Sequence, residues 1–178
     1  MSRVLLLAVM LLGTAGCSGG GPKEPATTAP SRITVSSPAF HDGGSIPVEY
    51  TCDGAGTSPP LAWSGTPADA KALAIVVDDP DAPNGTFTHW VLLDLDPKTT
   101  SLAAGSTPAG AVQAANSAGK SSYYGPCPPS GTHHYRFTVY ALSKATNLAA
   151  GTKLADALKA IDSNAIVRGR LTAVYRRQ

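Results

Sequence analysis

Two short segments of this 178-residue chain hold most of the side chains that could do chemistry. They are DDPDAPNGTFTHWV at positions 78–91 and YYGPCPPSGTHHYRF at positions 123–137, and together they contain three of the four histidines. Each segment runs from a turn rich in proline and glycine into an apolar stretch with strand character, and each places a histidine at that junction. Side chains there are held by a rigid sheet but still reach solvent, which suits a binding site.

The first segment begins with two carboxylates in a stiff turn. Proline at positions 80 and 83 makes the backbone around Asp79 and Asp81 rigid and extended. Such carboxylates can cap backbone amides, accept hydrogen bonds from a ligand or orient a histidine. We expect Asp81 to cap the turn and Asp79 to point toward a site. His89 is by default a buried core residue of its strand, but the neighbouring acids could orient or charge its imidazole.

The second segment places a histidine and a tyrosine on the same face of a strand. Side chains alternate along a strand, so His133 and Tyr135 face one side and His134 faces the other. We expect His133 to lie with the core-facing set, at the open end of the strand. Tyr123 adds a hydroxyl, and Gly125 lets the backbone approach a ligand and offer an amide to an anion. Because an imidazole with an unperturbed pKa of about 6.5 can carry charge, this combination favours a small anion such as phosphate or carboxylate.

The elements that must position these residues are predominantly strands. Six segments are rich in β-branched and aromatic residues: 32–37, 46–51, 72–78, 87–95, 134–142 and 166–175. Positions 72–77 and 91–95 are almost continuously apolar, which is typical of central strands covered on both faces. One helix is predicted late in the chain, where Thr152 could cap an apolar i, i+4, i+7 pattern that begins at Leu154. The sequence therefore predicts one mainly β domain with a late α-helix and a long surface loop between 98 and 122.

The N-terminus has the pattern of a bacterial lipoprotein signal peptide. An apolar run at 4–12 is too short to span a bilayer as a helix, and small residues then lead to Cys17. We interpret residues 1–16 as a signal peptide cleaved before Cys17, which then carries acyl chains and anchors the chain to the cell membrane. An ordinary secretory signal is the alternative. Residues 17–30 lack large apolar side chains, so we expect a flexible tether to a domain at 31–178 that lies outside the cytoplasm.

Net charge and cysteine content indicate which classes of partner and which cellular compartment suit this chain. The chain carries a formal net charge of +2 and 6% aromatic residues, which gives no electrostatic basis for binding nucleic acid. With Cys17 lipidated, Cys52 and Cys127 remain as an even pair in an oxidising compartment. Both occupy loop-like positions, so a disulfide between them is geometrically feasible. Two free thiols, one buried and one near the pocket, are the alternative.

Both chemistry-bearing segments resemble the signature regions of the phosphatidylethanolamine-binding protein family, also called Raf kinase inhibitor-like proteins, and most closely its bacterial branch. The matching stretches are DDPDAP with THW, YGPCPP-SGTHHYRF-VYAL and YTCDGAGTSPPLAW, and the likeness covers residues 32–176. The resemblance implies a two-sheet antiparallel β fold with a small anion pocket at one end. It also implies the residues of that pocket: Asp79, Asp81, His89, Tyr123, Gly125, His133 and Tyr135. The eukaryotic members end in a helix with a pocket tyrosine, whereas this chain ends in the strand-like RLTAVYRRQ.

These observations favour a membrane-tethered binding protein for a small anionic ligand or a lipid head group, with no cofactor. A hydrolase using His89 or His133 as a base is an alternative, but there is no G-x-S-x-G motif and no obvious nucleophile beside a histidine. A metal site built from these histidines and an aspartate is another, although no dense spacing of cysteine and histidine supports it. Family members also suggest a protein-inhibitory role, such as protease inhibition through the 98–122 loop, with an unknown protein partner.

Overall fold

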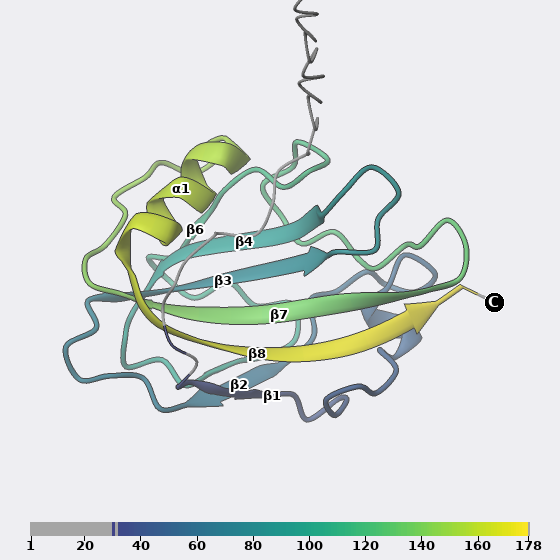
Figure 1. Ribbon diagram of the computed structural model, residues 1–178, viewed down its shortest axis with the longest axis horizontal. Coiled ribbons are helices and arrows are strands. Elements are labelled where there is room, and N and C mark those ends of the chain that lie inside the picture. Colours follow the sequence, from purple (N-terminus) through teal and green to yellow (C-terminus); the bar gives the residue numbers. More distant parts are fainter. Residues whose placement is uncertain (1–29, 31, 178) are drawn as a thin grey trace, which may run out of the picture.

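The computed structural model describes residue 30 and residues 32–177, which form three layers (Figure 1). The elements are β1 (Thr34–Ser36), the 3₁₀ helix η1 (Val48–Tyr50), β2 (Leu61–Ser64), β3 (Ala72–Asp79), β4 (Phe87–Leu95), β5 (Ser101–Leu102), β6 (Val112–Gln113), β7 (Thr132–Leu142), α1 (Leu154–Asn164) and β8 (Ala165–Arg176). A five-stranded antiparallel sheet, in the order β6-β4-β3-β7-β8, lies in the middle. An antiparallel sheet of β1, β2 and β5 covers one face, and α1 packs on the other. The predicted mainly β fold with two antiparallel sheets and one late helix is therefore confirmed.

Strand β3 lies at the centre of the large sheet and is buried along its whole length. Ile75 and Val77 face the core between the two sheets. Ala74 and Val76 face the core under α1. This coverage of both faces explains the continuous apolar run in the sequence, as predicted. The strand ends in polar Asp79, so the apolar layers stop where the functional segment starts.

Helix α1 covers the large sheet with one apolar side. Its buried residues are Leu154, Ala157, Leu158 and Ile161, at the spacing of one helical face. The predicted cap is wrong, however, because the N-cap residue is Lys153 and it makes no capping hydrogen bond with its side chain. The hydroxyl of Thr152 donates instead to the carbonyl of Ala149, at 2.7 Å. Thr152 therefore closes the preceding turn rather than capping the helix.

The predicted strand at 46–51 is wrong beyond its first residue. The Ile46 amide donates to the carbonyl of Val174 at 2.8 Å, but the chain then turns into η1. Proline at position 47 has a φ of −58°, and its carbonyl accepts a hydrogen bond from the Tyr50 amide at 3.0 Å. The β-branched and aromatic residues that suggested a strand are therefore overridden by a proline that initiates a turn.

Two further differences concern short elements in the small sheet and at the edge of the large one. Strand β2 was not predicted, because it has only four residues between the prolines at 59–60 and Gly65. The 98–122 segment is not one surface loop, since it contains β5 and β6 and buries Ala114 and Asn116. Alanine, serine and threonine carry little periodic signal, so pairing with β2 and β4 decides these strands.

Cys52 and Cys127 form a disulfide, which confirms the predicted pairing. Their Cα atoms are 5.4 Å apart although 75 positions separate them in sequence. The predicted signal peptide, the lipidated Cys17 and the tether lie outside the described residues, apart from Pro30, whose carbonyl accepts a hydrogen bond from the Arg168 amide. Among the described residues, no helix has the length and apolar character needed to cross a bilayer.

Candidate functional site

A pocket of about 200 Å³ lies at the edge of the large sheet where β3 ends and where β4 and β7 begin. It is lined by Asp79, Ala82, Pro83, Phe87, His89, Tyr124, Cys127, Pro129, His133 and Tyr135. Because the three strands are antiparallel neighbours, the turn after β3 and the turn before β7 meet at the same edge. The two sequence segments that carry most of the chemistry therefore form one site.

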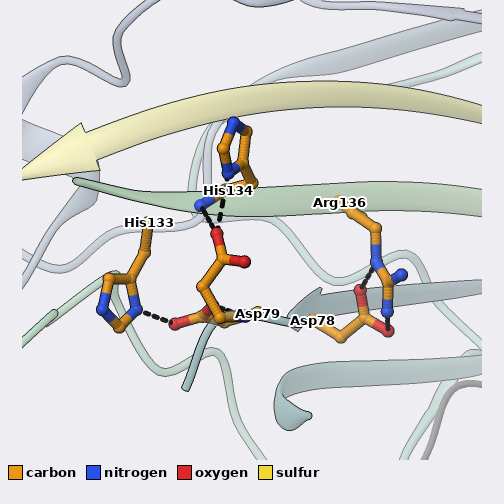
Figure 2. A network of polar contacts seen from close by, with 6 residues as sticks. Asp78, Asp79, His133, His134 and Arg136 are labelled. Carbon is orange, nitrogen blue, oxygen red and sulfur yellow. Dashed lines mark hydrogen bonds and ion pairs between the residues drawn. The ribbon is translucent and has the colours of Figure 1, made fainter. Parts of the chain in front are cut away.

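His133 and Asp79 form a buried pair in the wall of this pocket (Figure 2). The Nδ1 atom of His133 lies 2.7 Å from Oδ2 of Asp79, and their side chains are only 9% and 5% exposed. With the carboxyl ionised, Nδ1 donates and carries a proton, so Nε2 is the atom left for a ligand. The other carboxylate oxygen accepts the backbone amide of Asp81 at 2.8 Å. Both oxygens of Asp79 are thus engaged by protein donors.

Asp81 lies outside the lining of the pocket and holds the turn against β7. Its Oδ2 atom accepts the backbone amide of His134 at 2.8 Å and pairs with the His134 Nδ1 at 2.7 Å. Burial acts to raise the pKa of Asp81, but the hydrogen bonds and charge of His134 outweigh it and lower the pKa. The expected alternation along β7 is present, because His134 is exposed whereas His133 is buried. Asp81 accordingly caps a backbone amide, as expected for it.

His89 reaches the pocket through an irregularity in β4. Val77 pairs with Trp90 and Asp78 pairs with Thr88, so His89 has no partner opposite it on β3. Such a bulge adds one residue to a strand and redirects side chains, often beside functional sites. Here Trp90 stays in the core between the sheets, while the imidazole of His89 packs in a T-shaped arrangement with the Tyr135 ring, with centroids 5.3 Å apart.

The surroundings of His89 determine its tautomer and its charge. Its Nδ1 atom lies 2.7 Å from the carbonyl oxygen of Tyr124, and a carbonyl can only accept, so Nδ1 carries the proton. The imidazole is buried against the rings of Phe87 and Tyr124, at centroid distances of 4.8 Å and 5.9 Å. Burial lowers the pKa of His89 to about 4, although the Tyr124 carbonyl and Asp79 act in the opposite direction. His89 is therefore neutral at pH 7.

Tyr135 contributes a buried hydroxyl to the same pocket. The residue is 0% exposed, and its O–H finds no acceptor within the part of the chain that the structure describes, although the Cys127 backbone amide lies near the phenol oxygen. Burial and the nearby charge of Asp79 raise the pKa of Tyr135 above its ordinary value, an effect that the Cys127 backbone partly offsets. The hydroxyl is therefore protonated, and a buried donor of this kind calls for a partner.

Besides Asp81, two further residues predicted for the pocket lie beside it instead. Tyr123 donates its hydroxyl to the carbonyl of Tyr50 at 3.1 Å, and its ring packs in a T-shaped arrangement with that of Trp90. A side chain at Gly125 would bring its Cβ within 2.9 Å of the backbone of Thr51. Neither residue lines the pocket. Both hold the segment of the second signature against the turn that follows η1.

The sequence reasoning missed several residues of the lining. Tyr124, rather than Tyr123, contributes its ring to the pocket and its carbonyl to His89. Phe87 also lines the pocket, and its position two residues before His89 on the same strand was a signal that could have revealed it. In the described part of the chain, no group of three or more histidine, cysteine or acidic residues is arranged to hold a metal ion.

Comparison with known proteins identifies the family of this chain. Residues 36–176 match the sequence profile described as phosphatidylethanolamine-binding protein. The chain belongs to the phosphatidylethanolamine-binding protein family. The family membership that the two segments indicated is thereby confirmed.

Relatives of the chain include bacterial and archaeal proteins. A Mycobacterium tuberculosis protein named "Putative lipoprotein LppC" is 44% identical over 188 residues, which cover 96% of this chain and 92% of that protein. A UPF0098 protein of Methanothermobacter thermautotrophicus is 46% identical over 144 residues, covering 78% of this chain and 95% of that protein.

Solved structures show the same fold. YbcL of Escherichia coli, described as a member of the mammalian PEBP family, superposes with a TM-score of 0.78 at 31% identity, covering 83% of this chain and 100% of that one. A Chlamydia trachomatis protein described as a "Putative PhosphatidylEthanolamine-Binding Protein (PEBP) Homolog" superposes with a TM-score of 0.78 at 37% identity, covering 83% of this chain and 99% of that one.

Proposed function

We propose that this protein is a lipid-anchored binding protein whose pocket holds a small anion, phosphate-like or carboxylate-like. The observation that carries the proposal is the convergence of three polar groups on one small pocket: the imidazoles of His89 and His133 and the unpartnered hydroxyl of Tyr135. When His133 is protonated, its Nε2–H can donate to an anion while Asp79 compensates the positive charge. The ligand then meets two hydrogen-bond donors, His133 and Tyr135, beside the Nε2 acceptor of His89, rather than a bare carboxylate.

The size of the pocket supports a small ligand or a head group. Its volume of about 200 Å³ lies below the range of about 300–1,000 Å³ that is typical of pockets for drug-sized molecules. The rest of the lining is apolar or aromatic, including Phe87, Pro83 and Pro129. Such walls exclude water and strengthen the few polar contacts to a bound anion.

The lining favours binding over catalysis. It contains no serine or threonine, and the sulfur of Cys127 is held in the disulfide. The hydroxyl of Tyr135 has a raised pKa, which makes it a poor nucleophile. The Asp79–His133 pair does have the arrangement of an oriented base, so a panel of ester and phosphoester substrates is the appropriate assay. We expect no turnover, and turnover that disappears in His133→Ala would contradict a purely binding role.

The lipid anchor is supported by the relative named as a lipoprotein. Its match covers 96% of this chain. The 4% left out is shorter than the predicted signal peptide, so the match extends into that segment and includes Cys17. We expect mass spectrometry of the native protein to find acyl chains on Cys17, and we expect a Cys17→Ala protein to leave the membrane fraction. Retention of that variant in the membrane would argue against the anchor.

Calorimetry with matched variants tests the binding function. Phosphate, phosphoethanolamine and acetate are titrated in turn into the full chain in detergent, and then into His133→Ala and His134→Ala. We expect at least one of these anions to bind, and its affinity to fall by about tenfold or more in His133→Ala, which loses a charged donor. His134→Ala changes the neighbouring residue outside the pocket and should bind like the unsubstituted chain. Equal affinities in both variants, or no binding at all, would refute the site.

A further inference from the structure

We propose that this pocket selects anions that carry a proton, so that it binds a phosphate or phosphomonoester monoanion in preference to a fully deprotonated anion such as sulfate. The inference rests on the proposed anion-binding function and goes further by assigning the protonation state of the ligand. It follows from which atoms of the lining can only accept a hydrogen bond and which can only donate one.

His89 presents a fixed acceptor. Nδ1 of His89 lies 2.7 Å from the carbonyl oxygen of Tyr124, which keeps the proton of the neutral ring on Nδ1. Nε2 therefore has a lone pair and no hydrogen. A second bond, from the Tyr124 amide to the His89 carbonyl at 3.0 Å, ties the same two residues together through the backbone. The tautomer is therefore determined by main-chain geometry, which a ligand cannot rearrange at low cost.

The groups around His89 keep this acceptor neutral over the range in which phosphate titrates. The titratable groups that face it are Asp79 on β3, His133 on β7 and the phenols of Tyr124 and Tyr135. Asp79 favours the charged imidazole and His133 opposes it, but burial outweighs both and lowers the pKa to about 4. Protonating His89 to turn Nε2 into a donor would therefore require an acidic solution.

The other polar groups supply donors. The hydroxyl of Tyr135 is buried without a partner, and Nε2 of His133 donates when that ring is protonated. A monoprotonated phosphate fits this set, because its O–H donates to His89 while its anionic oxygens accept from Tyr135 and His133. Sulfate has only lone pairs at neutral pH, so one of its oxygens would face the lone pair of His89. A site built to hydrogen-bond a ligand O–H discriminates strongly against an analogue that lacks it.

Calorimetry on the full chain in detergent, from about pH 5 to pH 8, shows whether the pH dependence of the affinity comes from titration of the ligand or of the protein. The probes are phenyl phosphate, methylphosphonate and sulfate. We expect sulfate to bind at least about tenfold more weakly than phenyl phosphate at the lowest pH. The affinity for phenyl phosphate should fall above about pH 6, near the second pKa of a phosphomonoester. The curve for methylphosphonate should shift to higher pH, because its second pKa is higher.

Two variants assign the effect to His89. His89→Gln replaces the fixed acceptor by an amide that can also donate, so the preference for phenyl phosphate over sulfate should fall by about tenfold. Tyr135→Phe removes a donor and should weaken both anions by a similar factor, leaving the preference unchanged. If His89→Gln does not fold, the unsubstituted chain still tests the proposal. The pH midpoints at which its affinities for phenyl phosphate and methylphosphonate fall should differ.

The outcomes separate this inference from the proposed function. Comparable affinities for sulfate and phenyl phosphate would overturn the selectivity but leave the anion pocket in place. A single pH midpoint shared by phenyl phosphate and methylphosphonate would also overturn it, because a group of the protein would then be titrating. Failure of all three probes to bind at every pH would overturn the selectivity, and the anion pocket would fall with it only if phosphate, phosphoethanolamine and acetate also failed to bind.

Discussion

Two of the three acid–base pairs that join the end of β3 and the turn after it to β7 differ in exposure, and this difference decides how much each contributes to stability. Arg136 binds Asp78 through two bonds, Nε to Oδ1 at 2.6 Å and Nη2 to Oδ2 at 2.8 Å. The Asp78 side chain is 1% exposed and that of Arg136 is 20% exposed. His134 and Asp81 are 55% and 41% exposed, so water screens their interaction.

Removing the basic side chain from each pair should therefore have unequal effects. We expect Arg136→Ala to lower the free energy of unfolding by about 3 kcal/mol, because the buried carboxylate of Asp78 loses its bidentate partner. His134→Ala should cost less than about 1 kcal/mol, since the pair is exposed and Asp81 keeps its bond to the backbone amide. Urea unfolding monitored by tryptophan fluorescence measures both. Equal losses would contradict the assignment of stability to burial.

Acid should destabilise the protein through His89. Its pKa in the folded state, about 4, lies below the value of about 6.5 expected in the unfolded chain. The unfolded state therefore binds more protons between these values, and stability falls as the pH falls from about 6.5 to about 4. From pH 7 to pH 5 this group should cost about 2 kcal/mol of unfolding free energy.

Denaturant unfolding at a series of pH values checks this expectation. His89→Gln cannot be protonated, so its stability should decline less between pH 7 and pH 5 than that of the unsubstituted chain. Asp81 has a lowered pKa and stabilises the fold above the ordinary pKa of a carboxyl group, so its contribution is lost only at lower pH. Parallel pH profiles for the two proteins would show that His89 is not responsible.

At the scale of elements, the small sheet is anchored to the large one where β1 meets β8. The amides of Arg32 and Ile33 both donate to the carbonyl of Arg168, at 2.9 Å and 3.1 Å. The next residue on β8 is Gly169, and a Cβ atom there would overlap the carbonyl oxygen of Ile33. Only a residue without a side chain permits this approach of two backbones.

Gly169→Ala should accordingly separate the two elements. We expect a loss of about 2 kcal/mol in the free energy of unfolding, within the range for overpacking an interior contact. Gly119→Ala is the comparison, because its Cβ would have open space and would cost only the strain of a positive φ of +73°, about 1 kcal/mol. Chemical denaturation of both variants measures the two losses of unfolding free energy, and a larger loss in Gly169→Ala would show that close packing costs more than backbone strain. A larger loss for Gly119→Ala would rule out the packing explanation.

At the scale of the whole molecule, the disulfide joins the turn after η1 to the segment that precedes β7. The Cys52 amide also donates to the carbonyl of Pro126 at 3.0 Å, so the crosslink and a backbone bond reinforce the same contact. Cys127 lines the pocket as well. The crosslink therefore connects the stability of the fold with the position of one pocket wall.

Replacing both cysteines should test this crosslink. For the 75-residue separation, the chain-entropy relation gives a loss of about 4 kcal/mol in Cys52→Ser/Cys127→Ser. Unfolding of the unsubstituted chain should become easier by a similar amount in the presence of a reductant, whereas the double variant should not respond to it. A double variant as stable as the oxidised chain would show that the crosslink does not stabilise the fold.

The features that the sequence predicted correctly depend on short-range patterns. The continuous apolar run predicted that β3 is covered on both faces, and alternation along β7 separated His133 from His134. These predictions succeed because the period of a strand is imposed by its own backbone. The disulfide and the family followed from cysteine number and from two long motifs, which also require no knowledge of distant contacts.

The features that only the tertiary structure decided depend on contacts between distant segments. The bulge that aims His89 exists only in the pairing of β3 with β4, and the choice of Tyr124 over Tyr123 depends on how their segment packs against Tyr50 and Trp90. The proton on Nδ1 of His89 is likewise set by a carbonyl 35 positions away in sequence. Register, close packing and hydrogen-bond partners across such distances have no local period, so the chain alone determined which residues do chemistry and its fold determined which atoms face the ligand.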